Sequence, residues 1–230
     1  MSIASALRNE KKLLFDLTAF ELMLAKGVNF EIAAECLAES AMHDDSKIFF
    51  EKVAQAAANG KNQVNALTMK KVIKVDSTIE GEPKEFFWTN DIVQAFFSDN
   101  GSAPSISLRL KNLVEYYHYK HVLGEDPHVY NSDTIQEVVA LKLIGLLISS
   151  GVKPQRALVI AANDNKNKKL REIMLSTAQS GHSIAEHAEF VNFFGKIIAE
   201  LLKVGQRHNI LSEMFLQASV LQKTRADLSD

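Results

Sequence analysis

Hydrophobic residues recur along most of this chain every three or four positions, the spacing that places them on one face of an α-helix. In residues 4–26 they include Leu7, Leu14 and Leu17, with charged residues between them. The same spacing returns at residues 32–42, 47–58, 92–97 and 106–119. Residues 69–88 alternate only loosely and leave a small hairpin and a loop both open. The first half of the chain is therefore predicted to be mainly helical.

The second half shows the same periodicity. A helix is predicted from Thr134 to Ser150, where Thr134 and Glu137 have the spacing of a capping box, and Ser183 with Glu186 offers another. A polar turn is predicted at 163–167. In the first half, Asp44 and Asp45 are predicted to cap and charge the N-terminus of the helix that follows them. Further helices are predicted at 154–162, 168–179, 193–204 and 211–223.

One stretch of sequence occurs twice. Residues 20–34 and 144–158 each consist of an apolar helix end, a Gly-Val step, a short link and a second helix that opens on Ala-rich sequence. Glycine suits such a helix end because it accepts positive φ at little cost. The predicted turn glycines are Gly27, Gly60, Gly151, Gly181 and Gly205. The distance from Gly27 to Gly60 is 33 residues and that from Gly151 to Gly181 is 30, a difference that we assign to the first polar turn.

A repeat at this spacing predicts two copies of one helical module. The predicted fold is all-α, with two tandem antiparallel helical-bundle modules of about six helices each. The first module covers residues 1–121 with an insertion at 69–88, a linker follows at 122–132, and the second module covers 133–230.

Composition narrows the functional classes. Hydrophobic residues make up 47% of the 230 residues and charged residues 23%, as in ordinary globular proteins. A net charge of −2 gives no general attraction to nucleic acid or to anionic lipid. The single cysteine, Cys36, excludes an intramolecular disulfide, and no apolar run is long enough to span a bilayer. We therefore expect a cytoplasmic, soluble chain.

Candidate chemistry is sparse. His118 and His121 are three positions apart near a helix end, but a metal would need a third ligand, so an exposed helix end is the preferred interpretation. His182 and His187 do not share a helical face. Cys36 lies on an apolar helix face and is expected to be a small core residue. Phosphate-binding glycine loops, nucleophile elbows and paired CxxC motifs are absent from the sequence, so no enzyme activity, cofactor or metal is predicted.

The residues that favour partner binding are aromatic or basic. Amphipathic aromatic residues are typical of interfaces, and a cluster of cations can contact an acidic partner. The candidates are Trp88, Tyr116, Tyr117, Tyr119, Lys168, Lys169 and Arg171.

The ordered set of motifs resembles the cytoplasmic domain of the protein F family, the inner-membrane platform proteins of type II secretion and type IV pilus assembly. The second copy carries the resemblance best, through Ser150-Gly151-Val152, Ala157-Leu158, residues 181–188 and residues 198–215. The first copy matches through Lys26-Gly27-Val28, Ala33-Ala34 and residues 60–67. Family members often have an acidic residue after the last turn glycine, whereas this chain has Gln206 there.

The resemblance implies a non-enzymatic scaffold or adaptor of a pilus or secretion machine. It would bind the assembly ATPase and other machine components, form a homodimer, and lie peripheral to the inner membrane through its partners. Family members also carry transmembrane helices where this chain has a short polar linker. Two alternatives stay open: a soluble regulator that competes with the membrane platform for its partners, and an enzyme or metalloprotein built around the histidines.

Overall fold

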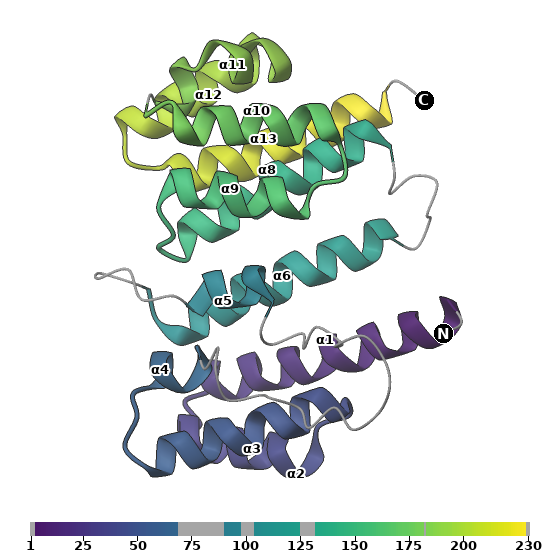
Figure 1. Cartoon of the computed structure of the whole chain (residues 1–230), viewed down its shortest axis with the longest axis vertical. Helices are drawn as coiled ribbons and strands as arrows, with labels where there is room; N and C mark the ends of the chain where they lie inside the picture. Colours follow the sequence, from purple (N-terminus) through teal and green to yellow (C-terminus); the bar gives the residue numbers. More distant parts are fainter. Residues whose placement is uncertain (1–2, 69–89, 98–103, 125–131, 182, 229–230) are drawn as a thin grey trace. The chain divides into compact units, whose positions relative to one another are not determined.

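The computed structural model describes residues 3–68, 90–97, 104–124, 132–181 and 183–228 (Figure 1). Within these ranges the regular structure consists of twelve α-helices and one short 3-10 helix, without any strand. The all-α fold class predicted from the sequence is thereby confirmed. Residues 69–88, including Trp88, lie outside the described residues, as does the hairpin or loop considered there.

The chain divides into two compact units. The first comprises residues 1–101 with 105–114, and the second comprises residues 102–104 with 115–230. The long helix α6 (Ile106–Gly124) contributes its first part to the first unit and its remainder to the second. Over the described ranges, no helix is both long enough and apolar enough to cross a membrane.

The first unit is built around a helical hairpin packed on α1. Its elements are α1 (Ile3–Ala25), α2 (Phe30–Ser40), α3 (Asp44–Ala58), α4 (Gln63–Leu67), α5 (Asp91–Phe97) and the start of α6. The buried rings of Phe20, Phe30 and Phe50 join α1, α2 and α3. The centroid of Phe20 lies 4.8 Å from that of Phe50 and 5.8 Å from that of Phe30. These separations are favourable for aromatic pairs, so the three helices share one core.

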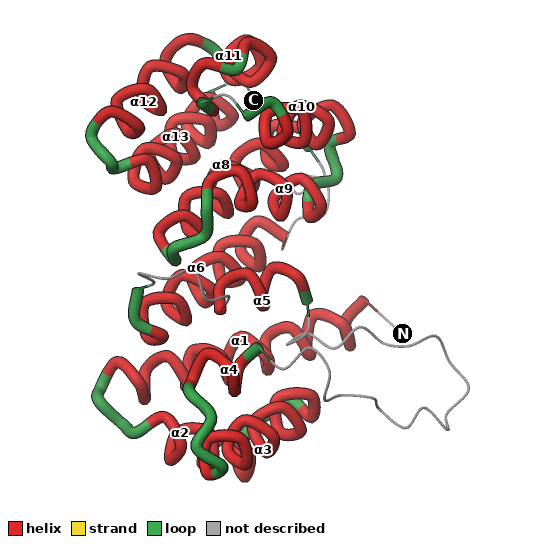
Figure 2. The backbone as a smooth tube through the Cα atoms, turned by 60° about the vertical axis from the view of Figure 1, so that its left-hand side comes forward, coloured by secondary structure: helices red, strands yellow, loops and turns green. Residues whose placement is uncertain are grey.

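The second unit surrounds α8 (Asp133–Ser149), which is buried at nearly every position from Ile135 to Leu147. A helix that is apolar all round belongs in the interior, and α9 and α13 lie against it (Figure 2). The other elements are α9 (Pro154–Asp164), α10 (Lys168–Gln179), the 3-10 helix η2 (Ile184–Glu186), α11 (Ala188–Phe194), α12 (Lys196–Arg207) and α13 (Leu211–Asp227).

The repeated stretch forms the same structure in both units. At the end of α1, the Val28 N–H donates to the Met23 carbonyl at 3.0 Å and φ of Gly27 is +83°. At the end of α8, the Val152 N–H donates to the Leu147 carbonyl at 3.0 Å and φ of Gly151 is +87°. Both are Schellman helix ends, in which the left-handed residue is usually glycine. Gly60 and Gly181 also have positive φ, of +76° and +70°.

Equivalent positions in the two hairpins differ by 124. The helices α2 and α9 each have 11 residues, and each is followed by a three-residue turn, 41–43 or 165–167. The difference between the two Gly-to-Gly distances lies in the next helix, since α3 has 15 residues and α10 has 12. Its assignment to the polar turn is therefore wrong. Three residues are close to one helical turn, so α3 can be longer while its buried face stays nearly in register.

Helix α3 begins differently from the sequence prediction. Its N-cap is His43, whose Nδ1 accepts a hydrogen bond from the Asp45 N–H at 3.2 Å. Asp44 and Asp45 occupy the first turn, where their negative charges interact favourably with the positive end of the helix dipole. The acidic pair therefore charges the helix start, but the histidine caps it.

Neither predicted capping box forms. The N-cap of α8 is Ser132, whose hydroxyl accepts the Ile135 N–H at 3.3 Å, so the helix starts before Thr134. Ser183 makes no capping bond, because its hydroxyl donates instead to Gln206 Oε1 at 2.5 Å. A nearby serine thus replaces Thr134 as the cap, and a tertiary partner takes the hydroxyl of Ser183.

The turn of each hairpin is held by a buried polar side chain from the preceding long helix. Asp16 of α1 is fully buried, and its two carboxylate oxygens accept the N–H groups of Met42 at 2.7 Å and His43 at 2.9 Å. In the second unit, Gln136 Oε1 of α8 accepts the Lys166 N–H at 3.1 Å. Met42 and Lys166 are equivalent positions, so both hairpins satisfy the same backbone donor in the same way.

We expect Asp16→Ala to lower the free energy of unfolding by about 2–3 kcal/mol, because two backbone donors lose a charged acceptor. Asp16→Asn is the matched variant; it keeps one acceptor oxygen, and we expect it to lose less. Urea unfolding followed by circular dichroism measures both. Equal stability of Asp16→Ala and the natural chain would contradict this role for Asp16.

Two glycines allow α13 to approach its neighbours. A Cβ on Gly145 of α8 would lie 3.0 Å from the Ser212 carbonyl oxygen, and a Cβ on Gly205 of α12 would lie 2.8 Å from Met214 Cγ. The prediction of a turn at Gly205 is wrong, because this residue is buried inside α12 and the positive φ of that turn belongs to Asn209. Gly205 serves close helix packing instead of chain reversal.

Gly145→Ala is expected to destabilise the chain by about 1–2 kcal/mol. Alanine gains about 0.5–1 kcal/mol in helix propensity, but overpacking against a backbone oxygen that cannot swing away costs about 1–3 kcal/mol. Gln217→Ala, at an exposed position of α13, is the control and should change stability little. A Gly145→Ala variant more stable than the natural chain in urea unfolding would refute the close-approach argument.

Candidate partner-binding surfaces

The tyrosines predicted to bind partners are largely used inside the protein. Tyr116 is fully buried, and its hydroxyl donates to a carboxylate oxygen of Asp164 at the end of α9. Lys120 Nζ lies 2.9 Å from both oxygens of the same carboxylate. Tyr116 therefore offers no surface to a partner and instead joins α6 to α9, which its sequence position could not reveal.

Tyr117 and Tyr119 are half-buried and retain some exposed surface. The Tyr117 ring lies edge-on to Tyr116, with 5.2 Å between centroids. Lys142 of α8 lies 5.6 Å from the centroid of the Tyr119 ring and also forms an ion pair with Glu115. Burial raises the pKa of Tyr119, and the charge of Asp227 adds to the effect. The contacts of Lys142 join α6 to α8, and only part of each tyrosine ring is left for a partner.

Glu137 is a second polar contact within this unit. Its carboxylate accepts a hydrogen bond from the Gln222 side chain and so links α8 to α13. Burial raises the pKa of Glu137 and the charge of Asp133 adds to this, while the Gln222 hydrogen bond and Arg225 oppose it. Since the pKa in the folded state lies above the ordinary value of 4.5, folding favours the protonated form.

Glu137→Gln should therefore stabilise the protein at neutral pH. The favourable contribution of protonated Glu137 is fully present below its ordinary pKa and is lost as pH rises through the raised folded-state pKa. Glutamine removes the charge and keeps an oxygen for Gln222, so the variant should exceed the natural chain in stability at about pH 7 and lose that advantage near about pH 4. Urea unfolding at the two pH values measures this, with exposed Glu213→Gln as control. Lower stability of Glu137→Gln at neutral pH would contradict it.

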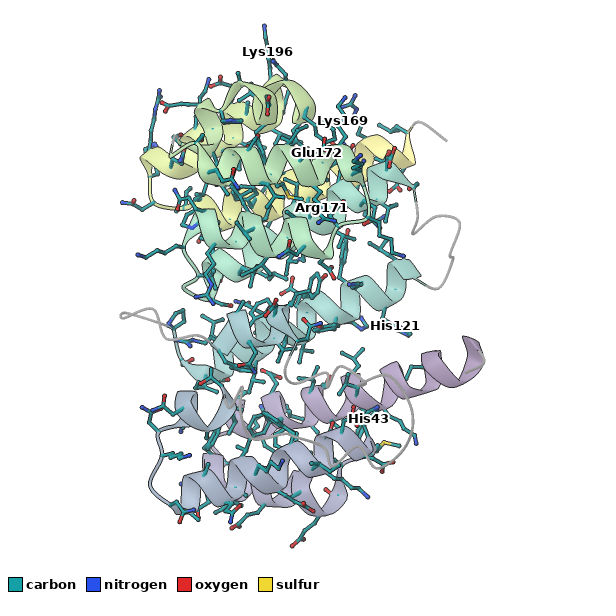
Figure 3. The ribbon with its side chains drawn as sticks, in the orientation of Figure 1. His43, His121, Lys169, Arg171, Glu172 and Lys196 are labelled. Carbon is teal, nitrogen blue, oxygen red and sulfur yellow. The ribbon has the colours of Figure 1, made fainter. Side chains whose placement is uncertain are left out.

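The predicted basic residues lie exposed at the start of α10. Lys168 and Lys169 occupy its first turn after the cap Asn167, and Arg171 follows (Figure 3). Lys169 Nζ lies 5.7 Å from the centroid of the Phe193 ring of α11. Positive charges at a helix N-terminus are unfavourable for the helix itself. This surface is therefore suited to an acidic partner.

Helix α12 carries an exposed apolar ridge that the sequence reasoning missed. Its Ile198 and Leu202 are buried in the unit, whereas Ile197 is 74% exposed and Val204 is also exposed. Five residues of this outer face line a shallow groove of about 410 Å³: Lys196, Ile197, Glu200, Leu201 and Val204. Figure 3 shows Lys196 extending away from the ribbon. The sequence did contain a signal for this ridge. Residues 197–204 include more apolar residues than one buried helix face can hold, so some of them had to be exposed.

The remaining candidates are distributed over the fold. Cys36 is exposed on α2, so its expected core position is wrong. His118 and His121 lie on α6, whereas His187 Nδ1 lies 3.0 Å from the Thr177 hydroxyl. His182 lies outside the described residues. Within the described ranges, no three His, Cys, Asp or Glu side chains gather as metal ligands.

Comparison with known families matches residues 140–230 to the family described as Type II secretion system (T2SS), protein F. The match begins inside α8 and includes α9 to α13, the segment in which the sequence motifs are clearest. The resemblance to the protein F family is thereby confirmed for residues 140–230. No curated protein matches the chain.

Proposed function

We propose that this chain, whose residues 140–230 match the protein F family, is a non-enzymatic scaffold of a type II secretion or type IV pilus assembly machine. The family match is the observation that carries the proposal. The scaffold would bind the assembly ATPase and other machine components through helix faces, act as a homodimer, and lie in the cytoplasm, peripheral to the inner membrane through its partners. Its mechanism would be to transmit movements of the ATPase through a rigid helical body.

The first unit is proposed to be a second copy of the same module. Support comes from the equivalent Schellman ends at Gly27 and Gly151 and from hairpins whose first helices, α2 and α9, each have 11 residues. The shared acceptor pattern at Met42 and Lys166 supports it further. The proposed modules cover residues 1–121 and 133–230, joined by the linker 122–132.

The apolar ridge of α12 is the proposed contact for a helix of the ATPase. An exposed isoleucine beside Leu201 and Val204 presents the i, i+4, i+7 spacing by which apolar helix faces pack. Lys196 and Glu200 flank the ridge, and Lys203 Nζ lies 2.6 Å from Glu200 Oε1. A charged rim around an apolar centre is the usual anatomy of a protein interface.

The test is binding of the purified chain to the assembly ATPase of the same cell, with ATP turnover measured in parallel. We expect binding with altered turnover, and we expect Ile197→Asp to weaken binding at least about tenfold because it buries a charge in the contact. Val220→Asp, at a 57% exposed site on α13, is the matched control and should bind as the natural chain does. Absence of binding at about 50 μM, a free energy weaker than about −6 kcal/mol, would refute the scaffold function as proposed.

A further inference from the structure

The two equivalent hairpins carry opposite charge. Residues 29–55 contain six acidic and two basic residues, whereas the equivalent residues 153–179 contain six basic and two acidic ones. The acidic residues of the first hairpin are Glu31, Glu35, Glu39, Asp44, Asp45 and Glu51. The basic residues of the second hairpin are Lys153, Arg156, Lys166, Lys168, Lys169 and Arg171. The overall charge of −2 conceals this inversion.

The inversion is sharpest where the second helix of each hairpin begins. Asp44 and Asp45 in the first turn of α3 are equivalent to Lys168 and Lys169 in the first turn of α10. Carboxylates stabilise a helix start and ammonium groups destabilise it, so the lysines act against the stability of their own helix. A surface selected only for stability would not place them there.

These charges lie on the outer sides of the hairpins. Glu35, Glu39 and Asp44 are exposed in the first hairpin, and Arg156, Lys168 and Arg171 are exposed in the second. Asp164, one of the two acidic residues of the second hairpin, is engaged by Lys120 and Tyr116. The second hairpin therefore presents a more uniformly positive surface than its composition suggests.

The acidic hairpin also exposes apolar side chains. Ile32 of α2 is 58% exposed and Met42 of the turn is 50% exposed, and Ile48 is exposed on α3. On the basic hairpin, Val159 of α9 is exposed. Apolar side chains among charges of one sign, facing a matching surface of the other sign, provide both burial and orientation for an interface.

We infer that the outer face of the α2–α3 hairpin of one copy binds the outer face of the α9–α10 hairpin of a second copy. The occupant is a second copy because the chain itself carries the complementary surface, on the equivalent hairpin and with equal and opposite net charge. This inference rests on the homodimer part of the proposed function and names its contact. Two copies that exchange the contact in both directions form a twofold dimer, whereas a contact made in one direction extends to longer assemblies.

The contact must weaken with salt, since screening reduces the attraction between exposed charges. The small net charge leaves little overall repulsion between copies, so the local attraction is expressed at low ionic strength. We expect self-association at about 50 mM salt and monomers at about 500 mM salt, where the screening length falls below the separation of most surface charges.

Charge exchange between the two faces provides the test. Variant A carries Glu35→Lys and Asp44→Lys, which removes the net negative charge of the first hairpin, and variant B carries Arg156→Glu and Lys168→Glu, which removes the net positive charge of the second. We expect each variant alone to associate at least about tenfold more weakly than the natural chain, since the attraction between hairpins of opposite net charge is then lost. An equimolar mixture of A and B should associate again, because the unaltered basic hairpin of A then meets the unaltered acidic hairpin of B.

A control variant with Glu186→Lys and Glu213→Lys has the same change of charge as A at exposed sites outside both hairpins, and it should associate as the natural chain does. Sedimentation equilibrium at low salt measures all five samples, and circular dichroism verifies that each variant is folded. A natural chain that is monomeric at about 100 μM and low salt, or folded A and B that do not associate when mixed, would overturn the inference. Because no ATPase is present, this result is independent of the scaffold test.

Discussion

The constraint on which both units depend is that the backbone donors of a tight helical turn need acceptors when the turn packs against another helix. The long helix of each unit supplies one, through Asp16 in α1 and Gln136 in α8. Each acceptor ties the turn of a hairpin to the long helix, and hydrophobic faces pack around this contact. In the second unit, Gly145 and Gly205 let α13 complete the packing.

The parts of the fold that could be predicted are those determined by local sequence. Gly27 and Gly151 end helices because a left-handed residue follows an apolar helix end, and Pro154 opens α9 in its first turn. Tertiary contacts determine what the sequence could not show. The sequence around Gly205 is typical of a turn, but the residue lies within α12. Its lack of a side chain leaves the space that Met214 of α13 occupies.

The candidate site was predicted less well for the same reason. Tyr116 is of a residue type that is common at interfaces, yet its hydroxyl donates a hydrogen bond to the Asp164 carboxylate inside the second unit. The ridge at Ile197 was missed because periodicity does not separate a buried stripe from an exposed one when both are apolar. Lys168 and Lys169 were recognised as a cluster, but their meaning depends on the equivalent aspartates, which only the register of the two hairpins brings into comparison.

The most direct measurement of the central claim is amide hydrogen exchange at Met42 and Lys166. Both residues are exposed and lie in turns, where amides ordinarily exchange rapidly. If Asp16 and Gln136 hold the two hairpins equivalently, both amides will be protected at least about a hundredfold relative to unstructured peptide. Protection of neither amide, or of only one, would contradict the claim that a buried acceptor on the long helix organises both units.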